Sequence, residues 1–180
     1  EALGATIHPF AMNKPGPEDL LSEDARARYA KTVCLKADVE KLLGNFFATA
    51  FRHPIGIAKL IGKALSSARG DVPLMARRLS HLLQAATVAR VCRTRGIQHV
   101  HAHFGQAPAT IAWFAAAIMK LDGQATWSFT IHGFQDFVDE TIARLDLKAE
   151  SAAFVVCISD FTRSQLCRLL HPSLWDKAKV

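Results

Sequence analysis

One stretch of this chain, residues 125–136 (ATWSFTIHGFQD), limits the choice of fold more than any other. Its first part, Thr126–Ile131, is rich in apolar, aromatic and β-branched residues, which is typical of a buried strand. The strand ends abruptly at His132 and Gly133, and a helix start follows. In open parallel sheets, ligands bind outside the carboxyl ends of the strands. The stretch therefore predicts a binding edge.

The same pattern occurs twice more in the second half of the chain. Residues 97–105 end in HFG and residues 153–160 end in SD. Helical patterns over residues 108–121, 137–150 and 160–170 separate or follow these strands, and residues 179–180 begin a further strand. This alternation predicts βαβ units and a parallel sheet. The ends of the three strands would then meet at one crevice, lined by His103, His132 and Ser159.

The first half of the chain is predicted to contain one strand and several helices. The strand covers residues 5–12, and NKPGP at residues 13–17 ends it. A helix begins at Ser22, and a helical pattern runs over residues 29–50. After a break at residues 52–54 we expect helices over residues 55–65 and from Asp71 to about residue 95, where Gly96 stops the second.

The positive charge of the chain is concentrated in one segment. The formal net charge is +6. Residues 26–69 contain nine Lys or Arg against Asp38 and Glu40, a net of +7, so the rest of the chain sums to −1. Such a segment suits an anionic partner, either lipid headgroups or polyphosphate.

The apolar runs inside this basic segment are too short to cross a bilayer, which needs about 20 residues. They fit a pair of interfacial helices, apolar on one side and basic on the other. An ordinary helical insertion that packs on the domain fits equally well. Phe46 and Phe47 favour the membrane surface if no protein covers them.

The cysteines and the ends of the chain add two expectations. The four cysteines include no C-x-x-C pair, so we expect neither a disulfide framework nor a structural zinc site, and a reducing compartment. The chain begins without methionine, and its last residues start a new strand. We therefore expect it to be part of a longer protein.

Three histidines, His99, His101 and His103, alternate along one predicted strand and so lie on one face. Such a set could hold zinc through imidazole nitrogens. A strand buried on both faces would instead place His99 and His101 between the sheet and its covering helices, as structural polar residues. His103 is the better functional candidate, because it is the last residue of the strand.

His132 and Gly133 form the strongest functional candidate, because a glycine at a strand end allows close approach of a ligand to the backbone. Asp136 could cap the following helix, which we favour, or orient a neighbour. Ser159 and Asp160 open the last helix, whose free amides attract anions, although capping alone would explain both. Arg163, one turn later, could meet a phosphate.

Several of these segments together resemble a known family. HVHAHFG at 99–105, FTIHGFQDF at 129–137 and CISDFTRSQL at 157–166 resemble the N-terminal domain of retaining glycosyltransferases with the two-domain GT-B fold. The likeness is to the group-1 (GT4-type) family of exopolysaccharide and lipid-linked glycan synthesis. ALGATIHPFAMN at 2–13 resembles that family's second strand, and the likeness is weakest over residues 26–69.

The resemblance implies a Rossmann-like α/β domain with a parallel sheet flanked by helices and a helical insertion at about residues 22–70. This domain would be the incomplete, acceptor-side part of the fold, without its first strand and helix and without the donor domain. A sugar would move from a nucleotide-sugar donor to a glycan or lipid-linked acceptor. The fragment alone would be inactive.

The resemblance also assigns roles to residues. His132 matches the motif histidine that contacts the transferred sugar, and its substrate-binding neighbours are Gly133, Phe134, Asp136, His103, Phe104, Gly105, Ser159 and Arg163. We expect no metal, no cofactor other than the nucleotide-sugar substrate and no nucleic-acid partner. The expected location is the cytoplasm, with peripheral attachment to the inner face of the cytoplasmic membrane as an option.

Two other functions remain open from the sequence. A metal-dependent hydrolase could use His101 and His103 as a ligand pair, but it would need a bound metal and further His or Asp ligands. Alternatively, the chain could be a non-catalytic membrane-surface module that binds through residues 26–69.

Overall fold

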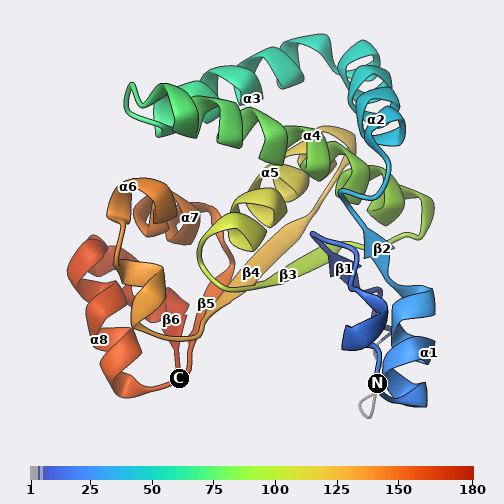
Figure 1. The fold of residues 1–180 in the computed structure, drawn as a ribbon. Coiled ribbons are helices and arrows are strands. Elements are labelled where there is room, and N and C mark those ends of the chain that lie inside the picture. The colour runs from blue at the N-terminus through green and yellow to red at the C-terminus, as the bar shows by residue number, and fades with distance from the viewer. Residues whose placement is uncertain (1–3, 5) are drawn as a thin grey trace.

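The computed structural model describes residue 4 and residues 6–180 (Figure 1). Four parallel strands form the main sheet in the order β3 (His99–His103), β4 (Thr126–Ile131), β5 (Phe154–Cys157) and β6 (Ala178–Lys179). Helices flank this sheet, so the predicted Rossmann-like α/β architecture is confirmed. β6 also confirms the strand expected at the end of the chain.

One face of the sheet is packed against helices. α5 (Ala107–Asp122) lies on β3 and β4, and α4 (Val72–Thr94) packs on α5. Because every βαβ crossover steps in the same direction along the sheet, right-handed connections place α5, α7 (Leu145–Ser151) and α8 (Asp160–Leu169) on the same face. The β4 side chains Trp127, Phe129 and Ile131 face these helices and are at most 1% exposed.

The other face of the sheet is open over β3. His99, His101 and His103 are exposed there, opposite Thr126, Ser128 and Thr130 of β4. The prediction that the three histidines share a face is confirmed. The alternative in which β3 is buried on both faces is wrong, because these imidazoles are exposed and lie against β4 hydroxyl groups, with His99 also stacked on Phe154 of β5.

The first half of the chain forms a second, smaller sheet and a helical layer. β1 (Phe10–Ala11) pairs in parallel with β2 (Val33–Cys34). The strand expected over residues 5–12 is therefore shorter, and residue 5 lies outside the described residues. η1 (Pro17–Asp19) and α1 (Glu23–Lys31) lie between β1 and β2, while α2 (Val39–Arg52) and α3 (Pro54–Ser67) pack on α4.

Two helix predictions were wrong because local signals end the helices. The pattern over residues 29–50 is broken by β2, and Asp38 starts α2 anew by accepting a hydrogen bond from Lys41 N at 2.9 Å. The helix expected over residues 137–150 is split into η2 (Phe134–Phe137), α6 (Glu140–Ala143) and α7. Arg144 breaks it with a left-handed φ of 44°, and its guanidinium holds the Asp146 carboxylate at 2.9 and 3.0 Å.

Other predictions of helix ends are confirmed. Ser22 caps α1 and Asp71 caps α4, each by accepting a hydrogen bond from a backbone N–H three residues later. Gly96 ends the α4 segment with a φ of 66°. The chain closes with η3 (Pro172–Lys177), which leads into β6. None of the helices within the described residues is long and apolar enough to cross a bilayer.

Candidate functional site

The carboxyl ends of β3, β4 and β5 lie at one edge of the sheet, as predicted. The three strands are parallel, with His103 paired to Thr130 and Ile131 paired to Cys157. At this edge His103 Nδ1 is 2.9 Å from His132 Nε2, and both rings are exposed. A hydrogen bond between two ring nitrogens needs one N–H and one lone pair, so the bond cannot persist when both rings are imidazolium.

Asp136 joins the two loops that carry these histidines. Its Oδ1 accepts a hydrogen bond from Gly105 N at 2.8 Å, and its Oδ2 accepts one from His132 N at 3.2 Å. The carboxylate is 3% exposed and does not cap its own helix. The favoured prediction, a helix cap, was therefore wrong, and the structure supports the alternative that Asp136 orients its neighbours.

Lys148 stabilises the loop that contains Gly105, and this role was not predicted from the sequence. Its Nζ donates to Gly105 O at 2.6 Å and to Gln106 O at 3.0 Å. Burial, with a smaller contribution from the nearby Arg78 charge, lowers the pKa of this amine well below its usual range, while Asp136 acts in the opposite direction. The available signal was its position among apolar neighbours on the predicted helix, where a solvated lysine is not expected.

Phe104 links the two loops through its ring. Its φ of 70° is left-handed, which is strained for a bulky residue and costs about 1–3 kcal/mol. The conformation is held by Phe104 N, which donates to Thr130 O at 2.9 Å, and by the bonds of Gly105 to Asp136 and Lys148. The ring is 52% exposed and lies 4.6 Å from the His132 ring. The strain thus places an aromatic ring beside the candidate imidazole.

The two glycines of the site differ in what surrounds them. A Cβ on Gly105 would lie 2.7 Å from Leu145 Cδ2 and 3.4 Å from the Asp136 carboxylate, so packing requires glycine there. A Cβ on Gly133 would meet no protein atom within 4 Å, and the backbone is extended. Nothing inside the described chain requires glycine at position 133. Phe134, the next residue, is exposed.

The imidazoles and hydroxyls of β3 and β4 form a continuous chain, here called the imidazole–hydroxyl ladder. His99 is hydrogen-bonded to Thr126 at 2.7 Å through Nδ1 and to Ser128 at 2.8 Å through Nε2. His101 is hydrogen-bonded to the same Ser128 oxygen at 2.7 Å through Nδ1 and to Thr130 at 2.9 Å through Nε2. Both histidines are thus satisfied polar residues, as expected, although by strand hydroxyls and not beneath helices.

Ser128 couples the protonation of the two ladder histidines. If its hydroxyl donates to His101 Nδ1, it accepts from His99 Nε2–H, so the two neutral rings have the same tautomer. Burial lowers the pKa of His99. Burial first, and then neighbouring histidines, lower the pKa of His101. These shifts favour the neutral form of both rings.

Ser159 and Arg163 lie at the same edge but are engaged within the protein. Ser159 Oγ accepts a hydrogen bond from Thr162 N at 3.2 Å, as an N-cap of α8, and is 2.6 Å from Thr162 Oγ1. Arg163 Nε donates to Ala178 O at 3.0 Å and so fastens β6. The structure therefore brings His103, Phe104, Gly105, His132 and Asp136 together, but it shows no such contact for Ser159 or Arg163.

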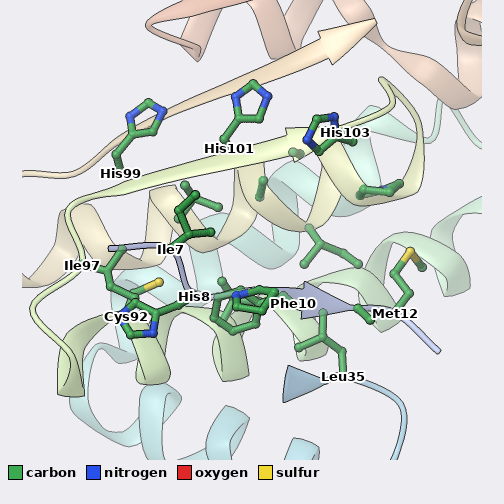
Figure 2. Close-up of a pocket in the computed structure, with 18 of the residues that line it drawn as sticks. Ile7, His8, Phe10, Met12, Leu35, Cys92, Ile97, His99, His101 and His103 are labelled. Carbon is green, nitrogen blue, oxygen red and sulfur yellow. The ribbon is translucent and has the colours of Figure 1, made fainter. Parts of the chain in front are cut away.

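An apolar groove of about 690 Å³ lies beside β3, between this strand and β1 (Figure 2). Phe10, Met12 and Leu35 lie on one side of it, and Ile97 and the backbone of β3 lie on the other. The imidazoles of the ladder point away from these apolar side chains. His99, His101 and His103 also belong to the lining, so the groove borders the candidate site.

Residues 4 and 6–180 contain no group of three or more His, Cys, Asp or Glu side chains placed to hold a metal ion. To become a metal ligand through either ring nitrogen, His101 would have to release the hydroxyl partner of that nitrogen. No protein-family model, no curated protein and no solved structure matches the chain.

Proposed function

We propose that the chain is the acceptor-side domain of a retaining glycosyltransferase that transfers a sugar from a nucleotide-sugar donor to a glycan or lipid-linked acceptor. The observation that carries the proposal is the clamp of Asp136 on Gly105 and His132. This clamp unites two of the motifs on which the sequence resemblance rests, at the edge where parallel α/β sheets bind ligands.

The geometry suits recognition of a sugar. His132 Nε2 is engaged by His103, while no described residue is hydrogen-bonded to His132 Nδ1. That nitrogen can exchange a hydrogen bond with a sugar hydroxyl, as donor or acceptor according to the tautomer. The exposed Phe104 ring offers an apolar surface beside it. The clear space around Gly133 allows a ligand to approach the backbone.

The charges favour the acceptor side over the diphosphate side. A leaving nucleoside diphosphate needs cations or free helix amides around it. Lys148 is buried and holds two carbonyls, and Arg163 holds the β6 backbone. Lys148 is therefore not free to neutralise a diphosphate, and Arg163 is held by its Nε, so in this proposal the donor phosphates are bound elsewhere in the enzyme.

The test uses the full polypeptide that carries residues 1–180, incubated with a panel of nucleotide sugars and a membrane lipid extract. Sugar transfer and nucleotide release are measured. His132→Ala should lower turnover roughly a hundredfold, because one positioned hydrogen bond is lost from the transition state. His171→Ala, which alters the exposed histidine that caps η3, should leave turnover unchanged.

Two results would contradict the proposal. One is equal turnover of the His132→Ala variant and the unmodified protein. The other is stoichiometric, tightly held zinc in the purified protein together with no sugar transfer, which would favour the metal-dependent hydrolase.

A further inference from the structure

A row of large apolar side chains is exposed along α2 and the start of α3. The row, here called the α2 stripe, consists of Val39, Leu43, Phe47, Phe51 and Ile55. These residues recur at every fourth position, so the four on α2 share one face of that helix. Their exposed fractions range from 41% at Leu43 to 92% at Phe51. An exposed apolar face of this kind marks a docking surface.

The opposite side of the same helices is packed and explains their position. Asn45 of α2 is buried and donates to Thr87 Oγ1 of α4 at 3.0 Å, and Ile57 and Leu60 of α3 are buried. Both helices are therefore anchored on α4 by their inner faces. The stripe is the outer face of this layer, which lies at the top of Figure 1.

Basic residues outnumber acidic ones on the helices that carry the stripe. α2 and α3 contain Lys41, Arg52, Lys59 and Lys63 against Glu40 and the N-cap Asp38, and Arg52 Nε is paired with Asp122 Oδ1 at 2.8 Å. α1, with Arg26, Arg28 and Lys31, lies at the opposite end of the molecule in Figure 1. The basic segment 26–69 is thus divided in the fold, and its α2–α3 part is the one that carries the stripe.

We propose that the α2 stripe docks on the surface of an anionic lipid bilayer. In this arrangement α2 lies in the plane of the interface, with Phe47 and Phe51 among the acyl chains and the lysines at the anionic headgroups. The helix layer is not a bilayer-spanning element. The proposal does not depend on sugar transfer.

The charges favour a membrane over a second copy of this chain. Each Arg52 stays paired with Asp122, so two copies joined through the stripe would bring six lysines together with two Glu40 and two Asp38 carboxylates, an excess of like charge that opposes the pairing. A bilayer with anionic headgroups supplies both the apolar layer and the opposite charge, and it needs no shape complementarity to a smooth row of side chains.

The experiment measures binding of the full polypeptide that carries residues 1–180 to vesicles by flotation. One set of vesicles contains phosphatidylcholine alone, and the other contains phosphatidylcholine with one quarter phosphatidylglycerol. Binding should be stronger to the anionic vesicles and should weaken at high salt, because salt screens the attraction between exposed charges. Phe47→Ser with Phe51→Ser should lower the partition coefficient roughly a hundredfold.

Matched variants test whether binding depends on this surface, and not on exposed apolar side chains or positive charge anywhere on the protein. Val138→Ser with Phe161→Ser removes two similarly exposed apolar side chains from the other end of the domain and should change binding less than about twofold. Lys41→Gln with Lys59→Gln should weaken binding to anionic vesicles roughly tenfold or more. Lys14→Gln with Lys31→Gln makes the same change in charge away from the stripe and should have little effect.

Lys63 is left unchanged because its Nζ lies over the Trp113 ring, 4.6 Å from the centroid, and its removal would disturb packing. Circular dichroism confirms that each variant is folded. The proposal is overturned if the unmodified protein ignores both kinds of vesicle or if the Phe47 and Phe51 variant binds as tightly. It is also overturned if this variant keeps its lipid binding but loses self-association or binding to a protein partner.

Discussion

The two faces of the β3–β6 sheet are organised by different forces. On the covered face, Trp127 and Phe129 stack with ring centroids 5.3 Å apart and are buried beneath the helix layer that includes α5. On the open face, the neighbouring β4 residues Ser128 and Thr130 hold a row of imidazoles through hydrogen bonds. Burial of apolar area thus defines one face. Directed polar contacts define the other, where the imidazoles remain exposed while Ser128 and Thr130 are buried.

The largest difference between the faces should appear in stability. Phe129→Ala on the covered face should lower the free energy of unfolding by about 3–5 kcal/mol, because it removes a fully buried ring and leaves a cavity. His101→Ala on the open face should cost less than about 1 kcal/mol, because water can replace its contacts. Denaturant unfolding of both variants measures the contrast. Equal losses would show that the open face is covered in solution.

The pH dependence should separate a covered histidine from the open ones. His81 of α4 is 5% exposed, and burial, with the charges of Arg78, Lys148, Arg77 and Lys36, lowers its pKa to about 4. As the pH falls below about 6.5, His81 binds a proton in the unfolded chain but not in the folded chain. The free energy of unfolding should therefore fall by roughly 3 kcal/mol between pH 6.5 and pH 4 and stay level for this group below that.

His81→Leu checks this expectation against the same unfolding curve. The free energy of unfolding of this variant should fall much less between pH 6.5 and pH 4. His99→Gln should keep most of it, because that ring is exposed on the open face. If His81→Leu retains the full slope, the loss comes from other groups, and the contrast between the faces does not extend to titration.

The two site glycines sharpen the comparison at the edge where the faces meet. Gly105→Ala should lower the free energy of unfolding by about 1–3 kcal/mol, because its methyl group presses on Leu145 and Asp136. Gly133→Ala should change stability by less than about 0.5 kcal/mol. The proposed ligand contact at Gly133 instead predicts a raised KM for the acceptor. Unchanged kinetics would remove Gly133 from the site.

The ladder should contribute little to stability, and the informative measurement there is spectroscopic. Ser128→Ala should cost about 1 kcal/mol, because a single hydroxyl is lost. Nitrogen NMR should show the same tautomer for His99 and His101 in the unmodified protein. In the variant the two tautomers should become independent. Different tautomers in the unmodified protein would show that Ser128 does not bridge the rings.

How much could be predicted differs between the two halves of the chain. Strand and helix alternate after residue 71 with clear caps, so the parallel sheet and the shared edge of His103 and His132 followed from the sequence. β2 and the break at Arg144 did not, because a two-residue strand and a left-handed residue leave little periodic signal. The roles of Asp136 and Lys148 could not be predicted either. The contact of Asp136 with Gly105 and those of Lys148 with Gly105 and Gln106 join residues at least 31 positions apart.

The clamp by one carboxylate has a consequence for affinity. Asp136 ties two loops into one rigid unit before any ligand arrives, and Lys148 closes it from behind. A visiting molecule then meets a surface whose shape is already set, so little protein entropy is lost when it settles. The residence time of the ligand would then depend on how well it fits this surface. Weakening the hydrogen bonds of Asp136 would first show as weaker ligand binding.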